Sequence, residues 1–167
     1  FTETERMKNN EFVPCAAPVV SLPQLGTYTD ALVELVGWYW TEGAENGAGV
    51  RIYQNSGPKA DRIRAAALAE FGQPCKLKRR AGEAPAWSDW RQNAGRCGYF
   101  AFNAAASARI RACAVPPKKV MSPEFLCALT RAQLDLLIDV SVQADGHGRV
   151  RAGGHRERMV GQKSRER

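Results

Sequence analysis

Two acidic residues stand in matching contexts in distant parts of the chain. Glu42 ends the apolar run 35–41, Asp145 ends the run 138–144, and glycine follows each acid. The two acids lie 103 residues apart (145 − 42). Both runs favour buried helices, and glycine commonly ends a helix because it adopts left-handed backbone without a steric penalty. The pattern therefore predicts two helices with a carboxylate in the last turn of each.

A carboxylate is electrostatically disfavoured at a helix C-terminus, where unpaired carbonyls carry partial negative charge. One such acid is most simply a solvated helix end, but two in matching context call for compensation. A divalent metal ion held between the two helix ends would supply it. Glu42 and Asp145 are therefore predicted to approach within one metal site of each other.

The first helix is expected over 31–42, with an N-cap at Thr29 or Asp30. It is apolar nearly all round, which predicts burial, and its small residues Gly37 and Thr41 would let another helix approach closely. Thr130 caps the second helix, with Gln133 placed to complete a capping box. Its predicted buried face consists of Leu134, Leu137, Ile138 and Ser141.

Between these helices, the sequence predicts a turn over 44–49, a strand over 50–54, a helix over 58–71, strands over 75–80, 86–92 and 97–102, and a short helix capped by Asn103. Outward-facing basic and aromatic side chains on these strands would suit a duplex backbone, although a solvated sheet edge looks similar. The predicted DNA contacts are Arg51, Tyr53, Gln54, Lys76, Lys78, Arg80, Arg91, Arg149 and Arg151.

The composition gives 24 Lys and Arg against 17 Asp and Glu among 167 residues, a formal charge of +7 that favours a polyanionic partner. The five cysteines form no C-x-x-C pair, which argues against a zinc site or a disulfide framework and predicts small buried hydrophobes in a reducing compartment. Neither a signal peptide nor a membrane span is evident, so we expect a cytoplasmic or nucleoid-associated protein that is not secreted.

The layout of helix, strands, helix, strands and helix starts again after Gly146, which indicates an internal repeat. We expect residues 1–26 to be the tail of an upstream module with a linker, 27–130 the first repeat, and 131–167 the start of a second, truncated repeat. The chain begins without Met and ends abruptly in the second repeat, so it is interpreted as a piece of a longer reading frame.

The two acid-ended helices resemble the paired helices of LAGLIDADG homing endonucleases, and most closely those of the intein-associated (DOD-type) branch. The segment 99–103 and the lysine-proline block 117–126 resemble the region that precedes the second motif helix in that family. Residues 5–14 resemble the end of an intein splicing block. The resemblance covers about residues 28–160.

This resemblance implies an α+β fold with a pseudo-twofold αββαββα repeat, the second repeat being incomplete, in a monomer with internal pseudo-symmetry. It implies site-specific cleavage of double-stranded DNA, with catalytic Glu42 and Asp145 binding Mg²⁺ or another divalent cation. Lys119 is the candidate central basic residue, with Lys118 and Lys76 as alternatives, and a surface lysine in a loop is the plain reading. The implied helix interface consists of Gly37, Thr41, Val140 and Ala144.

Two departures from the family pattern lie in the second motif, where Val140 occupies the small-residue position of the helix crossing and Gln143 an apolar one. Two other functions compete with an intein-embedded endonuclease. One is a degenerate LAGLIDADG module, maturase-like or regulatory, that binds nucleic acid without cleaving it. The other is an interaction domain whose charges are merely solvated, which predicts no charge clustering around Glu42 and Asp145.

Overall fold

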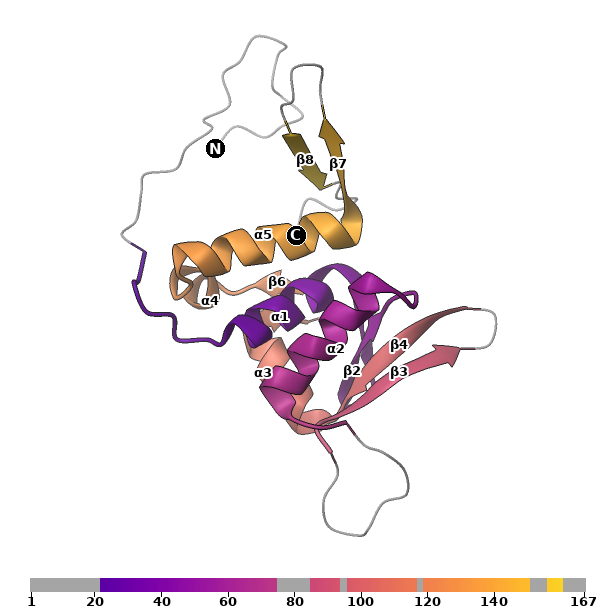
Figure 1. The fold of residues 1–167 in the computed structure, drawn as a ribbon. Helices are drawn as coiled ribbons and strands as arrows, with labels where there is room; N and C mark the ends of the chain where they lie inside the picture. The colour runs from indigo at the N-terminus through magenta and orange to yellow at the C-terminus, as the bar shows by residue number, and fades with distance from the viewer. Residues whose placement is uncertain (1–21, 75–84, 94–95, 117–118, 151–155, 161–167) are drawn as a thin grey trace, which may run out of the picture.

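A computed structural model of the chain describes residues 22–74, 85–93, 96–116, 119–150 and 156–160. The fold is α+β, as predicted, with helices packed on one face of a small antiparallel sheet (Figure 1). The predicted strand 75–80, with Lys76, Lys78 and Arg80, lies outside the described residues. So do most of the expected upstream module (1–21), Lys118 and Arg151.

Helix α1 (Asp30–Glu42) occupies the centre of the molecule, between α5 on one side and α2 and the sheet on the other (Figure 1). Thr29 is its N-cap, as predicted, because the Thr29 side-chain oxygen accepts a 3.1 Å hydrogen bond from the Leu32 amide. Packing on several sides explains why apolar residues surround this helix. Its buried residues are Leu32, Val33, Leu35, Val36, Gly37, Trp38 and Tyr39.

The next strands form a four-stranded sheet in the order β1-β2-β4-β3. They are β1 (Gly43–Asn46), β2 (Gly49–Tyr53), β3 (Trp87–Asn93) and β4 (Arg96–Phe102). Helix α2 (Pro58–Phe71) lies between the β1–β2 and β3–β4 hairpins in the sequence. The predicted turn over 44–49 was wrong, because β1 occupies much of it and pairs with β2. An exposed polar strand lacks apolar alternation, and only Gly47, with a φ of 59°, marks the actual turn.

Helix α3 (Ala104–Cys113) begins at the predicted Asn103 cap, where Asn103 Oδ1 accepts from the Ala106 amide at 2.9 Å. Two short strands, β5 (Ala114–Val115) and β6 (Val120–Met121), and α4 (Pro123–Cys127) lead into α5 (Arg131–Asp145). The predicted capping box is confirmed, since Thr130 and Gln133 exchange two 3.2 Å hydrogen bonds between side chains and amides.

The predicted buried face of α5 is only partly right. Leu137 and Ser141 are buried and Leu134 is partly buried, but Ile138 is 52 % exposed. Instead, Val140 is fully buried, because α5 turns this side of the helix toward α1. The view of the cysteines as buried hydrophobes holds for Cys113, while Cys97 is half-buried and Cys127 is exposed.

A hairpin of β7 (Gly146–Val150) and β8 (Arg156–Val160) follows α5 directly and projects from its C-terminal end (Figure 1). The α1–β1–β2 segment has the same organisation, with a helix ending in an acid and a hairpin starting at the next glycine. The described backbone therefore contains a repeated helix–hairpin unit. None of the described helices has the length and apolar character needed to cross a bilayer.

Candidate metal site and nucleic-acid interface

Helices α1 and α5 lie parallel and in register. Near their N-termini, Gln133 Nε2 donates to Asp30 Oδ1 at 2.9 Å and to the Tyr28 carbonyl at 2.7 Å. Midway along, Gly37 faces Val140, and a Cβ built on Gly37 would lie only 2.8 Å from Val140 Cγ1. Asp30 and Gln133 are 103 residues apart, and Gly37 and Val140 have the same separation (140 − 37).

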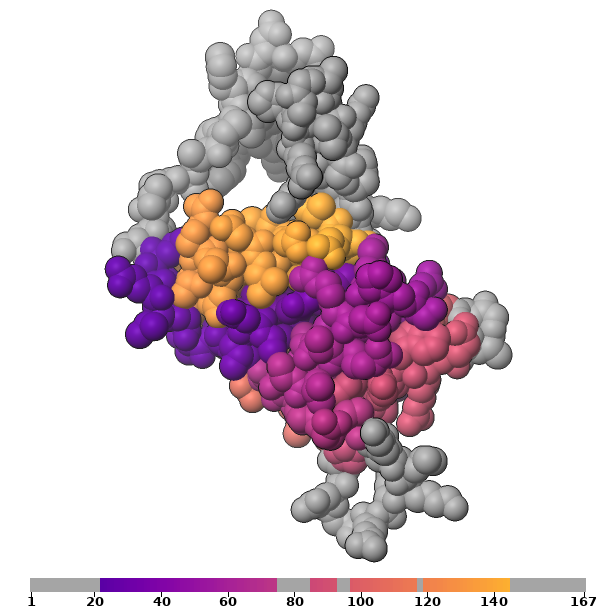
Figure 2. Space-filling model, viewed as in Figure 1, coloured from indigo at the N-terminus to yellow at the C-terminus, as the bar shows by residue number. Residues whose placement is uncertain are grey.

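That separation also relates Glu42 to Asp145, the last residues of the two helices. Because the helices are parallel and the paired positions differ by the same 103 residues, Glu42 and Asp145 lie at the same end of the helix pair. Figure 2 shows α5 (orange) lying along the segment that contains α1 (indigo). The side chains of Asp145 and Arg149 are outside the described part of the structure, so the predicted meeting of the two carboxylates stays a prediction.

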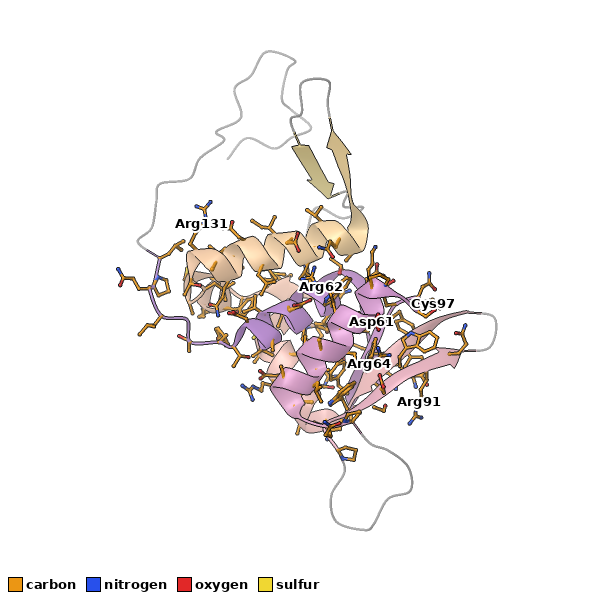
Figure 3. The ribbon with its side chains drawn as sticks, in the orientation of Figure 1. Asp61, Arg62, Arg64, Arg91, Cys97 and Arg131 are labelled. Atoms are coloured by element: carbon orange, nitrogen blue, oxygen red, sulfur yellow. The ribbon has the colours of Figure 1, made fainter. Side chains whose placement is uncertain are left out.

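Arg62 of α2 joins the two motif helices. Its guanidinium lies 2.8 Å from Glu34 Oε1 on α1 and 3.1 Å from Asp139 Oδ2 on α5 (Figure 3). Burial would lower the pKa of Arg62, but the hydrogen bonds to both carboxylates raise it overall. Gln143, a departure from the family pattern, donates to Asp139 at 2.8 Å and so supports this bridge.

The other predicted interface residues have separate places. The Thr41 hydroxyl donates to the Gly37 and Trp38 carbonyls of its own helix at 3.0 and 3.2 Å. Ala144 is partly buried against the core. Gly37 therefore makes the close approach to α5, because it alone on α1 lacks the Cβ that would strike Val140.

Glu42 is half-buried where α1 ends and β1 begins. Its charge reaches Cys97 on β4, whose thiol pKa is raised by burial and then by Glu42. Within the described ranges, no three His, Cys, Asp or Glu side chains gather into a metal-binding group. Glu42 itself supplies a carboxylate oxygen, the ligand type that hard divalent cations prefer.

Lys119 lies against the same end of α1 and is only 8 % exposed, unlike a surface lysine in a loop. Its ammonium donates to the Gly43 carbonyl at 2.9 Å and to the Tyr39 carbonyl at 3.2 Å. The same nitrogen lies 5.7 Å from the centre of the Tyr39 ring. The structure thus brings Lys119 and Glu42 to one helix terminus from positions far apart in the sequence.

A second network lies behind this terminus, on the helix side of the sheet. Glu45 of β1 accepts hydrogen bonds from the Tyr39 hydroxyl and the Arg111 guanidinium. Burial, followed by the hydrogen bond to Glu45, raises the pKa of Tyr39. Burial would raise the pKa of Glu45, but hydrogen bonds from Arg111 and Tyr39 lower it overall. Arg111 also donates to the Ala48 and Gly49 carbonyls, at 3.0 and 3.2 Å, and so fixes the β1–β2 turn.

The sheet has two chemically different faces. Val50, Ile52, Trp87, Phe100 and Phe102 are buried on the face that α1, α2 and α3 cover. The alternate positions, which point to the opposite face, include the predicted Arg51 and Tyr53 and also Tyr99. Arg91 joins them, because Arg91 and Tyr99 are direct partners between β3 and β4. We call the set Arg51, Tyr53, Arg91 and Tyr99 the outer sheet face.

Cation and aromatic groups contact each other on the outer sheet face. The Arg51 guanidinium carbon lies 4.5 Å from the centre of the Tyr99 ring, and the Tyr53 and Tyr99 ring centres are 5.9 Å apart. Arg51 Nε is buried without a hydrogen-bond partner. Neither Arg51 nor Arg91 forms an ion pair with any described carboxylate. Within the described residues, the face therefore presents two arginines without a carboxylate partner.

The structure does not bring Gln54 onto this face. The strand ends at Tyr53, the Gln54 side chain accepts from the Asn55 amide at 3.0 Å, and the Gln54 carbonyl accepts from Trp90 Nε1 at 2.8 Å. A register shift between Ser88 and Arg91 turns Trp90 toward the helix side.

Sequence reasoning missed several residues of this region. The alternation in 97–102 could have found Tyr99. It lies two residues from Cys97, on the same side of the strand, and next to the buried Phe100, which points to the other side. No local pattern marks Arg62, Arg111 or Glu45, whose partners lie on other elements. The sequence matches no protein-family model, and its comparison with curated proteins gives no match.

Proposed function

We propose that this chain is part of a metal-dependent, site-specific DNA endonuclease with the LAGLIDADG fold. The observation that supports the proposal most is the parallel, in-register packing of α1 and α5, each ending in an acid followed by glycine and a hairpin. The element order α1-β1-β2-α2-β3-β4-α3 agrees with the αββαββα repeat of that fold. The β7–β8 hairpin after α5 agrees with the start of a second repeat.

The outer sheet face would bind the duplex. Arginines that have no carboxylate partner among the described residues, set among tyrosines, suit contacts to phosphate oxygens and base edges. Arg51 is held by Tyr99, so its guanidinium is partly pre-oriented before DNA binds. Glu42 lies at the junction between this face and the end of the helix pair, where it affects Cys97.

Glu42 and Asp145 would hold Mg²⁺ at that junction. When bound, the ion lowers the pKa of a coordinated water and stabilises charge on the leaving oxygen of the phosphodiester. Glu42 is half-buried, so part of its side chain is shielded from solvent at this junction. The chain's own contribution is to present the carboxylates together and to hold DNA beside them.

The test is nicking or linearisation of a supercoiled plasmid library carrying random duplex inserts, with and without Mg²⁺. We expect cleavage of a few inserts, lost in Glu42→Gln and Asp145→Asn while duplex binding is retained. Glu124→Gln and Asp135→Asn are matched controls, since both residues are exposed acids on helices. Duplex binding without cleavage by the unmodified chain would favour the degenerate binding module. Absence of both would refute the proposal.

A further inference from the structure

The last turn of α1 carries an acid where a helix least favours one, and a buried cation lies at the same helix end. The Lys119 ammonium donates to the Gly43 and Tyr39 carbonyls, at 2.9 and 3.2 Å. Carbonyls at a helix C-terminus carry partial negative charge that a cation stabilises. Lys119 therefore offsets the terminus at which Glu42 adds a further negative charge.

These two hydrogen bonds join two secondary-structure elements. Tyr39 belongs to α1 and its carbonyl also accepts the Gly43 amide, while Gly43 is the first residue of β1. One ammonium thus ties the final turn of the helix to the beginning of the strand. Glu42 lies between these two anchors, directly before Gly43, so its backbone has little freedom.

The backbone of Lys119 shows that its position is specified. Its φ is 55°, in the left-handed region that lysine rarely adopts. Such a conformation persists where surrounding contacts fix it. Lys119 directly precedes β6, and β6 pairs with β5 through Val120 and Val115. The β5–β6 hairpin therefore delivers this lysine to the end of α1.

We infer that Lys119 is a positioning residue, whose ammonium holds the end of α1 and the start of β1 and thereby places Glu42, rather than a residue that contacts DNA phosphate. Two of its three N–H donors are directed at backbone carbonyls, and the residue is almost fully buried. The importance of placing Glu42 rests on the proposed function, but the anchoring does not.

Amide hydrogen exchange of the full chain tests the anchoring directly. Lys119→Met keeps an unbranched side chain of nearly the same length and removes the donors. We expect roughly tenfold or faster exchange in peptides covering 40–46, because bonds from charged donors are among the stronger ones. Exchange in 30–36 should not change. Lys59→Met, at an exposed lysine of α2, is the matched control and should leave both segments as they are.

Duplex binding separates positioning from phosphate contact. A lysine on a phosphate would lower the slope of log K against log salt by about 0.9 when removed. With a fluorescent random-sequence duplex, we expect Lys119→Met to keep the wild-type slope and Arg51→Met to lower it. A slope lowered by Lys119→Met, or unchanged exchange at 40–46, would overturn the inference.

Nicking kinetics complete the test. Displacement of Glu42 should lower kcat of Lys119→Met roughly tenfold or more with KM for DNA unchanged, and Lys119→Arg, which keeps a cationic donor, should recover part of the loss. A raised KM with unchanged kcat would contradict the inference. If the unmodified chain neither binds nor nicks DNA, the proposed function fails, but the exchange experiment still decides the anchoring. If Lys119→Met does not fold, Lys119→Gln replaces it in each assay.

Discussion

The contact between Gly37 and Val140 makes the helix crossing measurable. In Gly37→Ala the new Cβ would lie 2.8 Å from Val140 Cγ1, 3.2 Å from Val140 Cβ and 3.3 Å from Leu137 Cδ1. Val140 is fully buried and β-branched, so it cannot rotate away without another clash. Either α1 and α5 move apart or the side chains leave their preferred rotamers.

Two opposing terms set the magnitude. Alanine in place of a helical glycine gains about 1 kcal/mol of helix propensity. Overpacking of a buried site costs about 1–3 kcal/mol. We therefore expect Gly37→Ala to lower the free energy of unfolding by about 0–2 kcal/mol, although the same substitution at an uncrowded helix position stabilises.

Urea unfolding followed by circular dichroism measures this effect, and a double-mutant cycle makes it specific. Val140→Ala removes the atoms that Gly37→Ala strikes, so the double variant should be more stable than the sum of the single changes predicts, by about 0.5–3 kcal/mol. Val115→Ala, at a residue 49 % exposed on β5, should be additive with Gly37→Ala. Stabilisation by Gly37→Ala without coupling to Val140 would refute the crossing of α1 and α5 at these residues.

Three further predictions concern charge and pH. Arg62→Met should lower the free energy of unfolding by about 1 kcal/mol, because its two ion pairs are partly exposed, and the loss should shrink as salt is added; urea titrations at two salt concentrations measure it. Glu42→Gln should lower the pKa of the Cys97 thiol, since burial and the Glu42 charge both raise it; alkylation of the Cys97 peptide should become faster near neutral pH, and an unchanged rate profile would place the carboxylate elsewhere. Burial raises the pKa of Cys113 from 9.0 to about 11, so the unfolded chain ionises first and stability should fall between these pH values; the fall should be smaller in Cys113→Ala when unfolding is measured across that range.

Local chemistry explains the predictions that succeeded. The caps at Thr29, Asn103 and Thr130 depend on a side chain bonding an amide three residues away, so the sequence contains both partners. The outward positions of Arg51 and Tyr53 follow from strand alternation. By contrast, β1 could not be recognised, because an exposed strand of small and polar residues has no apolar period.

The candidate site could be predicted only in part from the sequence. Glu42 and Asp145 were predicted from their matching contexts, and the constant offset of the paired helices puts both positions at the same end of the pair. The burial of Lys119 against the end of α1 could not be foreseen, since a lysine in a loop carries no local mark of its partners. The exposure of Ile138 was mispredicted because periodicity gives the apolar face of a helix but not what covers it.

The sequence by itself determined the approximate extents of α1, α2, α3, α5 and of strands β2, β3 and β4, and which acids share a context, because these properties depend on residues a few positions apart. Only the tertiary structure decided that Gly37 meets Val140 and that Arg62 bridges two helices. It also decided that Lys119 is buried against the end of α1 and is not solvated in a loop. Those contacts join residues from 28 to 103 positions apart. They depend on packing and on the path of the chain, which no local pattern of residues encodes.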